Sequence, residues 1–296
     1  MPSSTDLGAI LTAMVTPFDS GGAVREDAVR RLARHLVEHG SDGVVVAGTT
    51  GESATLDDAE KLHLMEVVVD EVGDSATVVA GTGSNDTAHS VHLTRQASER
   101  GVDAVLVVTP YYNKPNRRGL VEHFKAVAAA TELPVILYNI PARCVINLEP
   151  DLLIELGRID NVVGVKQANS DMDQARRIVE ESELSLYAGD DNLLGPFAEI
   201  GGAGGICVSS HLVGDRMKEL YEAARSGDVE RSRAIDRDLA DVYRTLFITP
   251  APATVKAALN LLGFEAGGVR LPLVEVDDSE LAEVRRMVES VRPVAA

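Results

Sequence analysis

Eight short, mostly apolar runs recur along the chain, and helical patterns lie between them. Residues 43–47 are a typical run, because three consecutive valines leave no polar alternation and predict a strand buried on both faces. The segment before Gly40 shows the helical pattern, since Val29, Leu32 and Leu36 fall on one stripe of a 3.6-residue period. The expected strands begin near residues 10, 43, 77, 104, 134, 162, 184 and 204.

This βα repeat with short connections predicts an α/β fold in which eight parallel strands close into a TIM (β/α)8 barrel. A doubly wound open sheet is the alternative arrangement of the same elements. Strand signals stop after Val213, so we expect residues 1–225 to form the barrel and residues 226–296 a C-terminal all-helical extension. Because no Ser- or Gly-rich linker separates the two parts, the extension should pack on the barrel or on a neighbouring subunit.

The charge balance disfavours several classes of partner. A formal net charge of −18 leaves no basic stripe to neutralise phosphates, which argues against nucleic acid and membrane surfaces. No apolar run approaches the roughly 18 residues of a membrane span, and no charged-then-apolar leader precedes Leu7. Two cysteines, Cys144 and Cys207, are too few for a disulfide framework, so the expected location is the cytoplasm.

Polar residues follow several of the expected strands, at the barrel end where active sites of this fold lie. Lys166 ends the run at residues 162–166, and a lysine there either extends outward into water or is held in a pocket. Only a lysine that loses its proton attacks a carbonyl group, so a chemical role requires a pocket that desolvates the amine. The other polar residues expected at this end are Thr49, Thr50, Tyr111, Tyr112 and Tyr138.

Four motifs with their order and spacing resemble the dihydrodipicolinate synthase family, within the pyruvate-dependent Schiff-base class I aldolases. The motifs are Gly48-Thr49-Thr50-Gly51-Glu52, Thr109-Pro110-Tyr111-Tyr112, Tyr138-Asn139-Ile140-Pro141 and Gly164-Val165-Lys166. The resemblance spans nearly the whole chain. It implies a lyase that condenses pyruvate with L-aspartate 4-semialdehyde in lysine and diaminopimelate biosynthesis, with 4-hydroxy-tetrahydrodipicolinate as the product.

The resemblance also implies roles for single residues. Lys166 would form the imine with pyruvate, while Tyr138, Thr49 and Tyr112 would form a proton relay, with Tyr138 as the general acid and base. In the family pattern this relay takes Tyr112 from a neighbouring subunit, which implies a homotetramer built as a dimer of dimers. The residues implied in substrate binding are Thr50, Arg143, Gly189 and Ile206. No metal ion and no organic cofactor is implied.

Two positions depart from the family pattern: Cys144 stands where Thr or Ser is usual, and Gln167 where an acidic residue is common. Arg143 favours the synthase, because an arginine there would bind the carboxylate of the second substrate. The alternatives are N-acetylneuraminate lyase or a 2-keto-3-deoxy sugar acid aldolase of the same family, and a non-catalytic binding protein on the same barrel.

The resemblance extends to a regulatory site where many of these synthases bind lysine. Four of its residues are matched here: Ser53, Ala54, Asn85 and Tyr111. Where the inhibited pattern has a histidine, a histidine or lysine, and an acidic residue, this chain has Asp58, Lys61 and His89, so the charge of the site is altered. Loss of one charge-assisted hydrogen bond to a cationic ligand lowers affinity about 10- to 150-fold, so we expect weak or absent inhibition by lysine.

Two further patterns carry no expected function. Residues 35–39 match the H-x-x-E-H zinc-peptidase pattern, but they are expected to face away from the barrel mouth, at its opposite end, with no evident third ligand. The glycine-rich run at residues 201–205 lacks a Walker lysine or a dinucleotide fingerprint. We expect this run to let the eighth strand pack tightly.

Overall fold

The structure is a computed structural model that describes residues 6–291, and its centre is a closed barrel of eight parallel strands in chain order. The strands are β1 (Ile10–Ala13), β2 (Gly43–Val46), β3 (Thr77–Gly81), β4 (Ala104–Val108), β5 (Val135–Asn139), β6 (Val162–Gln167), β7 (Ser185–Ala188) and β8 (Gly204–Cys207). Because β1 pairs with both β2 and β8, the sheet has no free edge. The barrel prediction is confirmed, and the open-sheet alternative is wrong.

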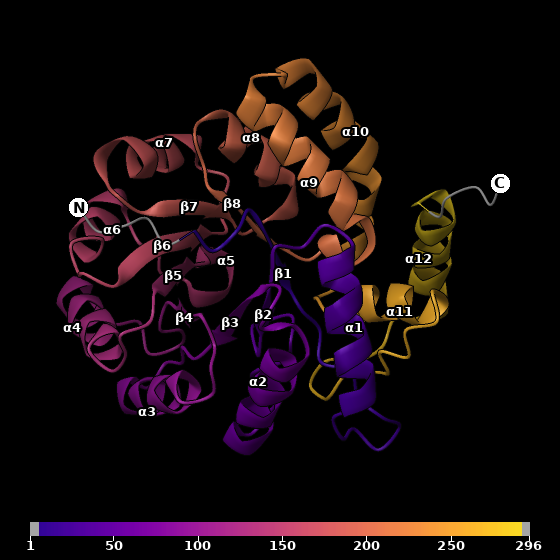
Figure 1. The fold of residues 1–296 in the computed structure, drawn as a ribbon, viewed down its shortest axis with the longest axis horizontal. Coiled ribbons are helices and arrows are strands. Elements are labelled where there is room, and N and C mark those ends of the chain that lie inside the picture. Colours follow the sequence, from indigo (N-terminus) through magenta and orange to yellow (C-terminus); the bar gives the residue numbers. More distant parts are fainter. Residues whose placement is uncertain (1–5, 292–296) are drawn as a thin grey trace.

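Helices surround the barrel (Figure 1). Before the last strand they are α1 (Glu26–Glu38), α2 (Asp58–Val72), α3 (Thr87–Ser98), α4 (Arg117–Ala128), α5 (Pro141–Cys144), α6 (Pro150–Leu156), α7 (Met172–Glu181), η1 (Asp191–Leu193) and α8 (Leu194–Glu199). After it come α9 (Ser210–Ser226), α10 (Val229–Leu246), α11 (Ala253–Leu261) and α12 (Asp278–Val291). Among the described residues, no helix is long and apolar enough to cross a membrane.

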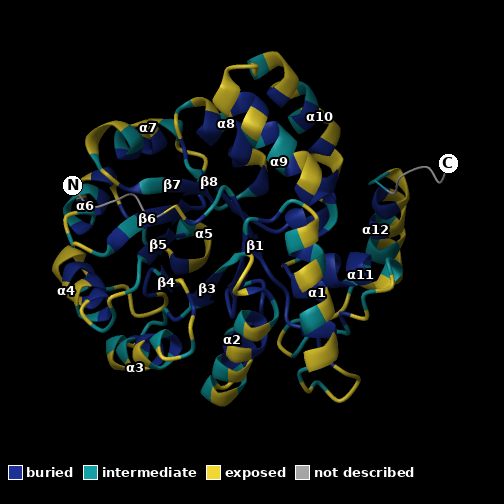
Figure 2. Ribbon diagram, in the orientation of Figure 1, coloured by how far each residue is buried: buried dark blue, intermediate teal, exposed yellow. Residues whose placement is uncertain are grey.

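The hydrophobic core lies inside the barrel and between the strands and the helices. Strand β2 is buried throughout, as its run of valines predicts. Helix α1 buries Val29, Leu32 and Leu36 against the strands, on the stripe that the sequence period predicts. Figure 2 shows the same division around the ring, with buried residues toward the strands and exposed residues on the outer helix faces. The barrel is therefore a packed scaffold, and its loops are free to carry the site.

Helix α5 is a single helical turn that follows β5 directly. Pro141 occupies the first turn of this helix, where its missing N–H costs nothing, and Val145 ends it in a left-handed conformation with φ of 66°. The helix has only one turn, which is too short for a periodic pattern to reveal. It carries Arg143 at the rim of the barrel.

The C-terminal extension packs on the barrel on the side of α1 and α9 (Figure 1). Gly227 ends α9 in a left-handed conformation, and the Asp228 carboxylate then caps α10 by accepting from the Arg231 N–H at 3.2 Å. A two-residue connection of this kind is a tight turn rather than a linker. The division into two domains at residues 225 and 226 stays a prediction.

Candidate active site

Lys166 lies on β6 in register with Tyr138 of β5 and Tyr187 of β7. Its side chain is buried, with 5% exposure, and its Nζ lies 4.4 Å from the centroid of the Tyr138 ring. Tyr138 has the same low exposure. The lysine is therefore held inside the barrel rather than extended into water, with the tyrosine beside it.

The groups around Lys166 are in a low-dielectric environment. Burial raises the pKa of the Asp190 carboxyl, and the neighbouring Asp191 raises it further, whereas Lys166 lowers it. Burial also raises the pKa of the Cys207 thiol and of the Tyr187 phenol, so both stay protonated at neutral pH. Lys166 is itself buried among these groups, which keep water away from its amine.

A network of side-chain amides supports the loop that follows β5. The Asn139 Nδ2 donates to Asn147 Oδ1 at 2.8 Å and to Gln167 Oε1 at 3.0 Å. The Asn139 Oδ1 in turn accepts from the Leu148 N–H at 3.0 Å. The network closes residues 139–148 into a loop around Arg143. Gln167, which departs from the family pattern, supplies an acceptor here without adding a charge next to Lys166.

The loop at residues 48–55 is a compact turn that carries Thr49 and Thr50. The Glu52 N–H donates to the Thr49 carbonyl at 3.1 Å, and the Thr16 hydroxyl donates to the Gly51 carbonyl at 2.7 Å. Glu52 itself has φ of 57°, a left-handed conformation that is uncommon for residues other than glycine. Thr50 is buried, with 5% exposure. The turn is thus fixed by several hydrogen bonds rather than loosely exposed.

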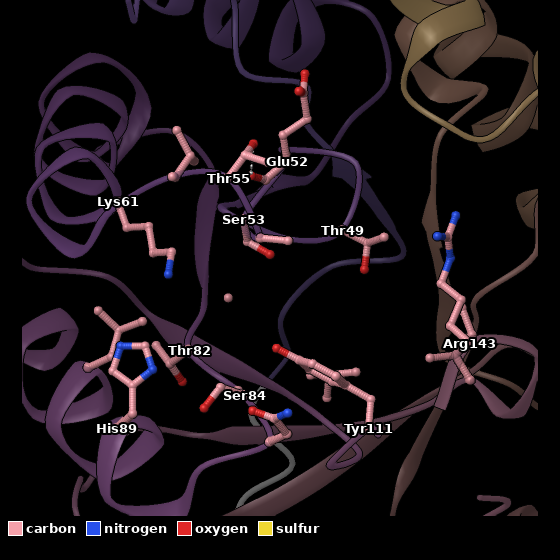
Figure 3. A pocket seen from close by; sticks show the side chains of 18 of the residues that line it. Thr49, Glu52, Ser53, Thr55, Lys61, Thr82, Ser84, His89, Tyr111 and Arg143 are labelled. Carbon is pink, nitrogen blue, oxygen red and sulfur yellow. Dashed lines mark hydrogen bonds between the residues drawn. The ribbon is translucent and has the colours of Figure 1, made fainter. Parts of the chain in front are cut away.

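A cavity of about 610 Å³ adjoins this loop. In Figure 3, Thr49 and Arg143 lie on one side of it, and Lys61 and His89 lie on the other. All seven residues predicted for a regulatory site line the cavity: Ser53, Ala54, Asp58, Lys61, Asn85, His89 and Tyr111. Neither Lys166 nor Tyr138 is among its lining residues.

The charged groups at the Lys61 end of the cavity already pair with one another. The His89 Nε2 lies 2.9 Å from both carboxylate oxygens of Asp58, and the Lys61 Nζ lies 3.4 Å from Asp58 Oδ1. Burial raises the pKa of Asp58, but the hydrogen bond and charge of His89, together with the Lys61 charge, hold it below its usual value. The Asp58 carboxylate is therefore ionised and already has His89 and Lys61 as partners.

The other predicted site residues lie in different surroundings. Tyr112 is 88% exposed and has φ of 70°, so its ring projects from the surface. Arg143 is also exposed. Ile206 is buried in β8, and the Gly189 N–H donates to the Gln167 carbonyl at 2.8 Å. Within one chain the structure brings Lys166 and Tyr138 into contact, and leaves Tyr112 at the surface.

Three residues that were not predicted from the sequence hold the loop at residues 48–55 from outside. They are Thr16, Lys256 and Arg270, which bind Gly51, Glu52 and Thr55. One signal for Lys256 was available, because it is the only charged residue in the apolar segment at residues 251–264. A lone charge in a buried helix requires a partner, but the sequence does not identify that partner.

The H-x-x-E-H pattern at residues 35–39 and the glycine-rich run at residues 201–205 both have structural explanations. The centroid of the His35 ring lies 4.3 Å from that of His39 and 4.4 Å from that of Phe264. The described residues contain no group of three or more His, Cys, Asp or Glu side chains that could hold a metal ion. At Gly204, an added Cβ would lie 1.9 Å from the Ala9 carbonyl oxygen. The glycine therefore permits the close approach of β8 to the chain before β1.

Comparison with known proteins connects this geometry to a family. The model of the dihydrodipicolinate synthetase family matches residues 6–291. The 4-hydroxy-tetrahydrodipicolinate synthase of Heliobacterium modesticaldum is 48% identical over 287 residues, which cover 96% of each chain. A crystal structure of dihydrodipicolinate synthase from Bacillus anthracis has a TM-score of 0.95 and 40% identity, covering 97% of this chain and 99% of that one. The enzyme of Cyanidioschyzon merolae, solved with lysine bound, has a TM-score of 0.94 and 38% identity, covering 96% and 98%.

Proposed function

The chain belongs to the dihydrodipicolinate synthetase family, and we infer that it is a lyase of lysine and diaminopimelate biosynthesis. The reaction is the condensation of pyruvate with L-aspartate 4-semialdehyde to give 4-hydroxy-tetrahydrodipicolinate. The observation that carries this proposal is the buried Lys166 held against the Tyr138 ring, inside a barrel whose relatives are named for this activity.

Lys166 is proposed as the nucleophile. Its neutral amine attacks the keto carbon of pyruvate, and loss of water gives an imine. Loss of a proton from the methyl group converts the imine to an enamine, whose carbon attacks the aldehyde of the second substrate. The amino group of the condensed product then displaces Lys166 and closes the ring, which returns the free lysine.

Tyr138, Thr49 and Tyr112 are proposed as the relay that moves these protons. Tyr138 lies against Lys166 in the same chain, whereas Tyr112 projects from the surface in an unfavourable backbone conformation. An exposed aromatic ring in such a conformation supports a contact with a second copy of the chain. We therefore propose that Tyr112 completes the partner's site in a homotetramer, a dimer of dimers.

Substrate carboxylates are proposed to bind at two places. Thr50 and the backbone amides of its loop hold the pyruvate carboxylate, since closely spaced N–H groups in a tight turn favour an anion. Arg143 binds the carboxylate of the aldehyde substrate, and Gly189 and Ile206 are proposed as further substrate-binding residues. Cys144 and Cys207 are both buried free thiols, which supports the proposed cytoplasmic location.

Reductive trapping tests this function. The protein is incubated with pyruvate, reduced with borohydride, and mapped by mass spectrometry. We expect one pyruvate adduct on Lys166 and none in Lys166→Ala. An adduct elsewhere, or none, contradicts the mechanism. Assays with aspartate semialdehyde, N-acetylneuraminate and 2-keto-3-deoxy acids then establish the second substrate, and we expect turnover of the first alone.

A further inference from the structure

A buried ion pair connects the loop at residues 48–55 to the C-terminal extension. The Lys256 Nζ of α11 donates to Glu52 Oε1 at 2.7 Å, and both side chains are at most 2% exposed. The other oxygen, Glu52 Oε2, accepts from the Arg270 N–H at 2.9 Å. Both carboxylate oxygens of Glu52 are therefore bound by residues more than 200 positions away.

The same part of the extension encloses the ammonium group. The Lys256 Nζ also donates to the Gly268 carbonyl at 2.7 Å and lies 4.0 Å from the centroid of the Phe18 ring. The Arg270 guanidinium lies over the same ring and donates to the Thr55 carbonyl at 2.7 Å. The loop is thus held at Glu52 and again at Thr55.

Glu52 lines the cavity, but its carboxylate does not face into it. In Figure 3 its carboxylate points away from Lys61, His89 and Tyr111. Its N–H binds the Thr49 carbonyl, so the position of Glu52 sets the position of the threonine turn. Its left-handed backbone is unfavourable for a glutamate and persists only where surrounding contacts impose it.

Stability alone does not account for this arrangement. A buried ion pair is weak evidence for stability, because well-packed apolar residues of similar volume often stabilise a protein equally well. The ion pair instead fixes the position of the loop, together with the contacts to the Gly268 carbonyl and the Arg270 N–H. We propose that Glu52 and Lys256 are positioning residues by which the C-terminal extension holds residues 48–55 in the conformation that binds pyruvate. This rests on the proposed function, because pyruvate is the ligand expected at this loop.

A second ion pair, of the same length but more exposed, serves as the control. The Lys218 Nζ lies 2.7 Å from Asp42 Oδ1, and the Asp42 Oδ2 accepts from the Ala9 and Ile10 N–H groups at 3.0 Å. Asp42 precedes β2, so this pair lies at the amino ends of the strands, opposite the catalytic loops. Lys218→Met removes an ammonium from a pair of the same length without reaching the loop at residues 48–55.

The experiment measures the rate of borohydride trapping against pyruvate concentration, and the melting temperature, for each full-length variant. Lys256→Met and Glu52→Gln should raise the half-saturating pyruvate concentration about tenfold or more. Lys218→Met should keep the value of the unmodified protein. The double variant Glu52→Gln/Lys256→Met leaves no buried charge without a partner. Its melting temperature should therefore be higher than that of Lys256→Met, while its half-saturating pyruvate concentration should stay raised.

The outcomes separate the inference from the proposed function. If the unmodified protein is not trapped at Lys166, the proposed function fails. If it is trapped, but the half-saturating concentration is unchanged in these variants or follows melting temperature across the whole set, the positioning role is wrong. Should Lys256→Met fail to fold, Glu52→Gln, which keeps the side-chain shape, and the double variant decide the question.

Discussion

Acidification should destabilise this protein through a histidine buried between the ends of β1 and β8. His211 is 1% exposed, its Nε2 accepts from the Val15 N–H at 3.1 Å, and its Nδ1 donates to the Val208 carbonyl at 2.7 Å. Both ring nitrogens are used, and the acceptor role of Nε2 requires a neutral ring. Burial lowers the pKa of His211 to about 4, with the Val208 carbonyl opposing the shift and His35 adding to it.

The size of the effect follows from that pKa. The ring has a pKa of 6.5 when unperturbed, so between pH 6.5 and about 4 the unfolded chain binds a proton that the folded chain does not. The contribution of His211 to stability is therefore present above pH 6.5 and is lost as the pH falls. Between pH 7 and pH 5 the loss is about 2 kcal/mol.

Urea unfolding at pH 7 and pH 5 measures this loss. His211→Asn lowers stability at both values, but the difference between them should shrink by about 2 kcal/mol relative to the unmodified protein. Met217→Ala, a buried change on the same helix without a titratable group, should keep the full difference. An unchanged pH difference in His211→Asn would refute the reasoning.

Three variants and one ligand test the site itself. Mixed oligomers of Tyr112→Phe and Lys166→Ala should be more active than either parent, because one site then has an intact lysine and the partner's tyrosine. Mixtures of Tyr138→Phe and Lys166→Ala should gain nothing, since these residues lie in contact in one chain. Activity titrated with lysine should show no half-inhibition at submillimolar concentrations, because Asp58 is already paired with His89 at 2.9 Å. Inhibition in that range would show that lysine displaces this pair.

The barrel was predictable because its information is local. The strands are short, mostly apolar runs, as in β2, and several helices have their own start signals. At α2, for example, Asp57 and Glu60 form a capping box before the apolar stripe. Connections are short and strands alternate regularly with helices, which predicts a parallel α/β sheet and favours its closure into the barrel that the structure has.

The support of the site was not predictable, because it depends on pairs distant in sequence. Lys256 and Glu52 are 204 residues apart, and nothing in either local segment selects the other. The same holds for His89 and Asp58, where motif matching placed both residues at one site without showing that they pair with each other. Sequence patterns thus locate side chains at one end of a barrel, but they do not show which charges are already satisfied there.

The loop that carries Thr49 and Thr50 derives its shape from both ends of the chain. His211 fixes Val15, and the next residue, Thr16, binds the Gly51 carbonyl, while the extension fixes Glu52. Protonation of His211 removes the acceptor of the Val15 N–H, so acid should loosen the first of these supports as it lowers stability. Pyruvate binding should therefore weaken before global unfolding at low pH, because the strained turn at Glu52 keeps its conformation only while both supports hold it.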